Sequence, residues 1–447
     1  MRRKNILIAS AVMSALCLLG GCGMLPLQLD EDSQEELSAS DKEEENQMKT
    51  EITDLTAQTA QMVTIDYSIE SYENVQRFGY DLLAQSLEDT NPVLSPLSAY
   101  LALSMAGCGA DGTTKAEFYN VLGNDMMALS DDMMNTLPAK GSSLNLSIAD
   151  SVWIDDAFIV NETWLGTIKS LMDAQTYQTD LSTEQTMNEI NHWIEDQTNG
   201  LIRQMLTEPL DDQARLALFN TVYFKGKWEI PFKANDTCKE SFYLSRDEIE
   251  QVDMMNLYLT DLDYIANDFA EGVILPYQKN ESDNDNSSAN LAFVALKPIE
   301  NGNARDVYNK LTSQVVSDIL ANKQTALVNL KLPKFEITFD KVLNESLSNM
   351  GLVECFDMDK ANFDQMGFTK SDDNLYISLV RQKAKIIVDE EGTEAAAVTE
   401  AVMACRGAIM DQPDPKEVYF DEPFVYMIMD MDRELPLFIG ILDNPML

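Results

Sequence analysis

Basic residues and histidine are scarce in this sequence of 447 residues. Lys and Arg number 32 against 75 Asp and Glu, which gives a formal net charge of -43 and a pI near 4.1. Nucleic acids, heparin-like polyanions and anionic membrane surfaces all bind through basic patches. The composition therefore argues against each of these partners. The acidity does not indicate overall disorder, because apolar residues make up an ordinary 45%.

The single histidine, His192, limits the catalytic chemistry that the chain can perform. A Ser-His-Asp or Cys-His hydrolase would have to use it as the base. It lies on a predicted helix beside Trp193, with no Gly-x-Ser-x-Gly motif nearby, so a hydrolytic enzyme is disfavoured. One histidine also excludes a His-rich metal site, and we expect no metal and no cofactor.

The first residues are typical of an export signal. Three basic residues at 2–4 precede an apolar run, 6–19, that is too short to span a bilayer comfortably. The run ends in Leu19-Gly20-Gly21-Cys22, which resembles a bacterial lipobox. Residues 1–21 are therefore predicted to be a lipoprotein signal peptide, and a plain signal peptide cut near here is the alternative. A lipid on Cys22 would anchor an exported protein at the bacterial cell surface, and without it the protein would be extracellular.

Cysteines are few and widely spaced. The sequence has six, with no CxxC pair, so it is neither a disulfide scaffold nor a zinc-binding pattern. Cys17 would leave with the signal peptide. The cysteines whose pairing the sequence leaves open are Cys108, Cys238, Cys355 and Cys405.

The chain is organised as an acidic segment followed by one large domain. Residues 22–68 are polar and acidic, and like charges repel, so we expect a flexible, extended tether. An isolated acidic helix is the alternative for its later part. Residues 69–447 contain no second linker of this kind and no internal repeat.

Helical and strand patterns are mixed within this domain, and the strands do not alternate regularly with helices, which favours an α+β fold. Phe78, Leu82, Leu83 and Leu87 recur at helical spacing. Residues 216–224 are apolar on both alternate sets and predict a central strand buried on both faces. Further predictions are long strands at 328–339 and 375–388 and a hairpin at 423–429 and 435–442.

One segment, 390–406, is divided unusually by strand alternation. One alternate set, from Thr393 to Cys405, has no charge and mostly small side chains, whereas the other holds Glu394, Glu400 and Arg406. As a strand, the segment can place a neutral face in a protein interior, and Gly392 supplies a permissive hinge. A short exposed Ala-rich helix is the alternative, and composition alone favours it, because Ala and Glu are good helix formers.

Arg406 is the only Arg or Lys between Lys385 and Lys416. A lone arginine on an exposed loop suits a protease whose specificity pocket carries an acid. An incidental surface arginine is the alternative.

At these residues the sequence resembles the serpins, the serine-protease-inhibitor family, over nearly all of residues 70–447. The segments that carry the resemblance are 91–98 (NPVLSPLS), 190–200 (INHWIEDQTNG), 219–228 (FNTVYFKGKW), 332–335 (LPKF), 391–397 (EGTEAAA), and the C-terminal PF at 423–424 and FIG at 438–440.

The resemblance implies an α+β serpin fold with three β-sheets, about eight or nine helices and an exposed reactive-centre loop at about 390–413. In inhibitory serpins the attacked bond lies fourteen residues after the hinge glycine, which here gives Arg406–Gly407. Family spacing and composition thus agree on Arg406, although attack at Cys405 or Met403 stays open. The implied hinge is Glu390, Glu391, Gly392, Thr393, Glu394, Ala395, Ala396 and Ala397.

The function implied by the resemblance is that of a suicide substrate with no catalytic group of its own. A trypsin-like serine or Arg-specific protease would form a 1:1 covalent complex with a monomer of this chain. The severed loop would then enter a five-stranded large sheet that is closed until cleavage. The residues implied to control sheet opening are Ser95, Ser98, Asn220, Trp228 and Gln382, which stands where the family commonly has a histidine.

Two further readings compete with inhibition. A non-inhibitory serpin would act as a binding or chaperone-like surface protein, but such relatives usually carry charged, bulky or proline residues in the hinge, and 393–399 has none on the inserting set. A solute-binding lipoprotein fits the lipobox but leaves the hinge and loop unexplained.

Overall fold

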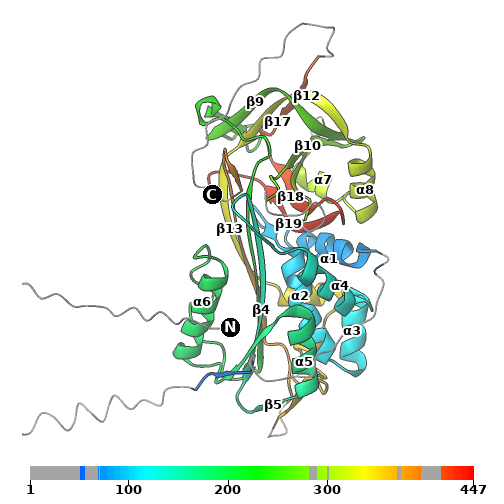
Figure 1. Cartoon of the computed structure of the whole chain (residues 1–447), viewed down its shortest axis with the longest axis vertical. Helices are drawn as coiled ribbons and strands as arrows, with labels where there is room; N and C mark the ends of the chain where they lie inside the picture. The colour runs from blue at the N-terminus through cyan, green and yellow to red at the C-terminus, as the bar shows by residue number, and fades with distance from the viewer. Residues whose placement is uncertain are drawn as a thin grey trace, which may run out of the picture. The chain divides into compact units, whose positions relative to one another are not determined.

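The computed structural model describes residues 51–55, 69, 71–280, 289–299, 302–369, 374–393 and 414–447. This part of the chain contains nine α-helices and three β-sheets (Figure 1). The predicted α+β class, with its three sheets and eight or nine helices, is confirmed.

The large sheet has eight strands among the described residues. Its strands, in spatial order, are β1 (Thr53–Asp54), β6 (Gln175–Thr179), β4 (Leu144–Asp155), β7 (Leu216–Lys227), β16 (Gly392–Thr393), β15 (Leu379–Val388) and β13 (Phe335–Val342), with β3 (Ala139–Lys140) beside β4. Five of them build the body of the sheet, and the other three are only two residues long.

A second, nine-stranded sheet packs beyond one end of the first. Its strands, in spatial order, are β17 (Lys416–Tyr419), β12 (Gln324–Pro333), β9 (Ile249–Ala266), β10 (Ala270–Pro276), β11 (Leu291–Pro298), β18 (Phe424–Asp430), β19 (Leu435–Leu442) and β2 (Val93–Leu94), with β8 (Cys238–Tyr243) beside β9. The predicted hairpin is confirmed as β18 and β19. The third sheet pairs β5 (Phe158–Val160) with β14 (Gly367–Thr369).

The long strand predicted at 328–339 was wrong as a single element. It is divided at Lys334 into β12 and β13, which belong to different sheets. Pro333 has no N–H for a ladder, and the N–H of Lys334 turns to the carbonyl of Asp253 at 2.8 Å, so the chain passes from one sheet to the other here.

Helices cover both faces of the large sheet. They are α1 (Glu73–Ala84), α2 (Pro96–Gly109), α3 (Gly112–Leu122), α4 (Met126–Thr136), α5 (Glu162–Met172), α6 (Glu184–Gln197), α7 (Ala304–Tyr308), α8 (Ser313–Ala321) and α9 (Asn344–Met350). Figure 1 shows α6 on one face and α1 to α5 on the other. Alternate residues of β7 accordingly enter two cores, Leu218 in the main one and Phe219 in a smaller one under α6, as predicted for a strand buried on both faces.

Most of the predicted signal and tether lies outside the described residues. The described part, 51–55, contains β1, which pairs with β6 at the edge of the large sheet, and Leu55 is buried. The predicted boundaries at 21 and 68 and the lipid on Cys22 therefore stay predictions. No described helix is long and apolar enough to cross a membrane.

Candidate functional site

The hinge of the predicted loop is already part of the large sheet. Gly392 pairs with Lys227 of β7, and Thr393 pairs with Gly226 of β7 and with Val388 of β15. At the opposite end of the same two strands, β7 and β15 pair directly over two positions only. The expected sheet that is closed until cleavage is thus corrected: one end is closed, and the other holds the first two residues of a further strand.

Glycine at position 392 is required by this close approach. A Cβ at Gly392 would lie 1.9 Å from the carbonyl oxygen of Gly226. Only a residue without a side chain lets the backbone pass between β7 and β15 here. The hinge glycine is therefore explained by the lack of space for a side chain.

Thr393 is held in a neutral pocket. Its side chain is 2% exposed, and its hydroxyl oxygen lies 2.6 Å from that of Tyr277. The Tyr277 ring stacks on Trp228 with 4.8 Å between centroids, and the Trp228 indole N–H donates to the carbonyl of Asp389 at 2.9 Å. Burial raises the pKa of Tyr277, so its hydroxyl stays protonated. Trp228 therefore contacts both the turn at Asp389 and the ring of Tyr277, whose hydroxyl bonds to Thr393.

The turn before the hinge is fixed by two acids. The Asp389 carboxylate accepts the N–H groups of Glu391 at 2.9 Å and Gly392 at 3.2 Å. Glu390 accepts from Lys334 at 2.7 Å and from the Thr237 hydroxyl at 2.8 Å. Burial acts to raise the pKa of Glu390, but these bonds outweigh it and lower the pKa overall. The hinge thus begins from an anchored turn.

The residues predicted to control sheet opening lie in three places, of which Trp228 at the hinge is one. In the second, Gln382 of β15 binds the start of α2: its amide oxygen accepts the Ser95 N–H and its amide nitrogen donates to the Ser95 carbonyl, both at 2.9 Å. The Ser95 hydroxyl in turn accepts the Ser98 N–H at 3.3 Å as the N-cap. A glutamine therefore makes this link with no titrating group.

The third place contains a residue that the sequence analysis missed. Asn220 of β7 donates its side-chain N–H to Asp150, the residue opposite it on β4. Asp150 interrupts the inward-facing set of β4, which is otherwise apolar, and this interruption is the signal that was available in the sequence. Trp228 lies eight residues beyond Asn220, roughly 26 Å along the chain, so Trp228 lies beyond one end of β7 whereas Asn220 lies within the strand.

The remaining site residues lie outside the described residues. These are Glu394, Ala395, Ala396, Ala397, Cys405, Arg406 and Gly407. Cys108, Cys238 and Cys355 are free thiols in the structure. His192 is exposed on α6, 3.6 Å from Asp196, with 67% of its side chain accessible. This is the exposed surface of a helix and offers no enclosed site for a catalytic base.

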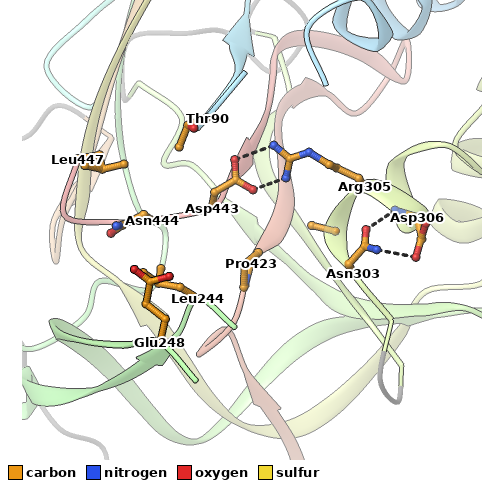
Figure 2. A pocket seen from close by; sticks show the side chains of 11 residues that line it. Thr90, Leu244, Glu248, Asn303, Arg305, Asp306, Pro423, Asp443, Asn444 and Leu447 are labelled. Carbon is orange, nitrogen blue, oxygen red and sulfur yellow. Dashed lines mark hydrogen bonds and ion pairs between the residues drawn. The ribbon is translucent and has the colours of Figure 1, made fainter. Parts of the chain in front are cut away.

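A pocket of about 600 Å³ lies near the C-terminus (Figure 2). Among the described residues that line it, Arg305 is the one basic side chain, and it is bound to groups of the protein itself. The guanidinium binds both carboxylate oxygens of Asp443 and donates to the carbonyls of Leu87 and Asp89. With Arg305 paired to Asp443, the described lining of the pocket offers no unpaired positive charge to an anionic ligand.

The comparisons with known proteins agree with this geometry. The profile described as "Serpin (serine protease inhibitor)" matches residues 73–445. The chain belongs to the serpin family. Serpins are generally protease inhibitors that bind target proteases, rather than catalytic enzymes, and are mostly secreted or extracellular.

Relatives match over almost their whole length. Iripin-8 of Ixodes ricinus is 30% identical over 389 residues, which cover 81% of this serpin and 90% of Iripin-8. The crystal structure of a thermophilic serpin, Tengpin, in the native state is 31% identical with a TM-score of 0.79, covering 88% of this chain and 99% of that one. Tengpin in the latent state gives 31% and a TM-score of 0.69, covering 85% and 99%. The fold described here is thus more similar to the native form.

Tyr277→Phe is expected to loosen the hinge of this serpin. The change leaves the buried Thr393 hydroxyl without its partner while keeping the stack on Trp228, at a cost of ~1–3 kcal/mol. Hydrogen exchange of the Gly392 and Thr393 amides should accelerate by about tenfold or more. Tyr426→Phe is the matched control, because the buried Tyr426 hydroxyl has no hydrogen-bond partner in the structure. Equal exchange in both variants would contradict the assigned role of Tyr277.

Proposed function

We propose that this serpin is a suicide-substrate inhibitor of trypsin-like serine proteases, with Arg-specific cysteine proteases as further targets. The observation that supports this most strongly is the position of Gly392 and Thr393 between β7 and β15. The uncharged alternate set begins at the residue that is already inserted. The residues that follow Thr393 could therefore extend a strand that has already begun between β7 and β15.

The large sheet offers an incomplete ladder to the rest of the loop. β7 and β15 pair directly only at Ala217–Leu379 and Leu218–Val380, and β16 separates them at the other end. An inserted strand would bond to both edges along the stretch between, each hydrogen bond contributing ~1 kcal/mol net. Burial of the small apolar side chains would add to this. Insertion is therefore strongly favoured once the loop is cut.

The proposed sequence of events follows from the unpaired stretch between β7 and β15. The protease serine attacks the Arg406 carbonyl, the Arg406–Gly407 bond breaks, and an acyl-enzyme forms. The released segment 393–406 is fourteen residues long, so its full insertion carries the protease on the order of 45 Å. Distortion of the protease's oxyanion hole then prevents hydrolysis of the acyl bond, because that hole stabilises the intermediate.

Trypsin provides the direct test of the inhibitory function. Wild-type protein should give a 1:1 complex that survives SDS, and mass spectrometry should place the broken bond after Arg406. Arg406→Ala should reduce the rate of complex formation by about 100-fold or more, since one lost charge pair in a specificity pocket costs ~3 kcal/mol. Arg246→Ala, at an exposed arginine of the β8–β9 turn, is the control. Cleaved protein with free, active protease would instead favour the non-inhibitory reading.

We also propose that the mature protein is a lipoprotein anchored through Cys22. The lipobox-like Leu19–Cys22 and the acidic segment that follows it support an anchored domain held away from the membrane surface. Fatty-acid labelling in a bacterial host should be lost in Cys22→Ser, with the protein released into the medium. Unlabelled wild-type protein would leave a plain signal peptide as the explanation.

A further inference from the structure

The main core of this serpin contains one carboxylic acid in the middle of the large sheet. Asp150 is 1% exposed and lies on the inward set of β4 between Ile148 and Val152, both of which belong to the apolar core. An ionised carboxylate in such surroundings costs several kcal/mol unless a cation or several donors compensate it. The protonation state of Asp150 therefore affects the stability of the large sheet.

The side chains of Asp150 and Asn220 have four polar atoms between them, and only two of these are hydrogen-bonded. The Asn220 side-chain N–H donates to Oδ1 of Asp150. Oδ2 of Asp150 and Oδ1 of Asn220 are both buried without a hydrogen-bond partner. Two acceptors cannot bond to each other, but a single proton on Asp150 turns Oδ2 into a donor. One proton can thus satisfy both oxygens, as in an acid–amide pair with two hydrogen bonds.

The elements packed around Asp150 bring no charge to it among the described residues. On its own side, α2 carries Tyr100 and Cys108, which donate to the carbonyls of Leu122 and Met105. Burial raises the pKa of both groups, so both are neutral. The other titratable groups of these strands belong to the alternate set that faces away from Asp150, and α6 covers the opposite face of the sheet. The strand residues are Lys140, Asp155, Tyr177, Tyr223, Lys225 and Lys227, and those of α6 are Glu184, Glu189, His192, Glu195 and Asp196.

We propose that Asp150 and Asn220 form a proton-dependent latch that holds β4 and β7 closed over α2 when Asp150 is protonated and releases them when it ionises. β7 is one of the two strands that must separate for further insertion. The other, β15, is bound to the start of α2 through Gln382 and Ser95. A negative charge on Asp150, beside Asn220 of β7, weakens the packing of β7 on α2. The bonds between Gln382 of β15 and Ser95 are unaffected. The latch itself does not depend on the proposed function. Its consequence, the control of loop insertion by pH, does.

The direction of the pH effect follows from linkage. Burial raises the pKa of Asp150 from 3.8 to about 7, and the bond from Asn220 offsets only part of this. A solvent-exposed Asp150, in an opened or unfolded form, has the ordinary value. Between about pH 4 and 7 the closed form therefore binds more protons than the opened form, and its stability falls as the pH rises through this window. Above pH 7 both forms are ionised and the effect is constant.

The test uses full-length protein without protease. The rate at which the native form is lost at a fixed elevated temperature is compared for wild type and Asp150→Asn from pH 5 to pH 8. Asn keeps the shape of the side chain but does not titrate. The rate of loss of wild type divided by that of Asp150→Asn should therefore rise about tenfold or more from pH 5 to pH 8. The exchanged pair, Asp150→Asn with Asn220→Asp, should restore the pH dependence because it keeps one acid and one amide.

Infrared spectroscopy supplies a readout that does not depend on the variants folding. Wild-type protein should show the carbonyl band of a buried, protonated carboxylic acid at pH 5.5, and the band should be lost as the pH passes about 7. A rate ratio that does not change with pH, or the absence of such a band, would overturn the latch. Complex formation with trypsin is scored separately: an intact complex without pH dependence removes only the latch, and pH dependence without a complex removes only the inhibitory function.

Discussion

Replacing Thr393 by arginine is expected to turn the inhibitor into a substrate. Thr393 occupies a buried position between β7 and β15, where its hydroxyl bonds to the uncharged Tyr277 hydroxyl, its one side-chain partner among the described residues. A guanidinium in this place costs ~3 kcal/mol or more, because the position is buried and the group it would meet there, the Tyr277 hydroxyl, carries no charge. Insertion then slows relative to hydrolysis of the acyl-enzyme by about 100-fold.

The measurement is the number of serpin molecules consumed per trypsin molecule inhibited. It should rise from near one to a value at which only cleaved serpin and active trypsin are found on a gel. Thr393→Val is the matched control, since it removes the hydroxyl but adds no charge, and it should inhibit within a few-fold of wild type. If Thr393→Arg inhibits as well as Thr393→Val, insertion does not begin at this residue.

Gln382→Leu is expected to shorten the life of the native form severely. The Gln382 side chain is 4% exposed and satisfies both the N–H and the carbonyl of Ser95. Leucine leaves the Ser95 N–H buried without a partner, at ~1–3 kcal/mol, and leaves the Ser95 carbonyl with only the 3.3 Å bond from the Ala99 N–H, so loss of the native form on heating should accelerate by about tenfold or more. This link contains no titrating group, and its contribution should therefore be the same at pH 5 and pH 8.

Gln365→Leu provides the control for this experiment. Gln365 is an exposed glutamine whose side chain makes one long contact, 3.3 Å, to Asp111, so its loss should change the lifetime little. Equal lifetimes for the two variants would show that the bond between β15 and α2 does not hold the sheet. A large difference at pH 8 but none at pH 5 would assign the effect to Asp150 instead.

Local patterns were sufficient to predict much of the fold. The two-sided burial of β7 and the β18–β19 hairpin follow from residues close together in the sequence, and both are confirmed. The break at Lys334 was missed because it depends on Asp253, a partner more than 80 residues away that accepts its N–H. Element type is thus a local property here, whereas assignment to a sheet is not.

The same distinction explains what was missed in the site. Spacing predicted the hinge and the loop, but the position of Thr393 between β7 and β15 involves Tyr277, which lies 116 residues away in the chain. Likewise the partner of Asn220 is Asp150, 70 residues before it, whereas family resemblance directed attention to Gln382. Contacts across a sheet join residues that no local pattern connects.

The account depends most directly on where the loop goes after it is cut. A crystal structure of the protein cleaved after Arg406, together with its heat resistance, measures this. We expect residues 393–406 to form a complete strand between β7 and β15, with the set that begins at Thr393 facing inward and a melting temperature well above that of the uncut protein. A cleaved form that keeps the two-residue β16, leaves the rest of the loop outside the sheet and melts at the temperature of the uncut protein would contradict it.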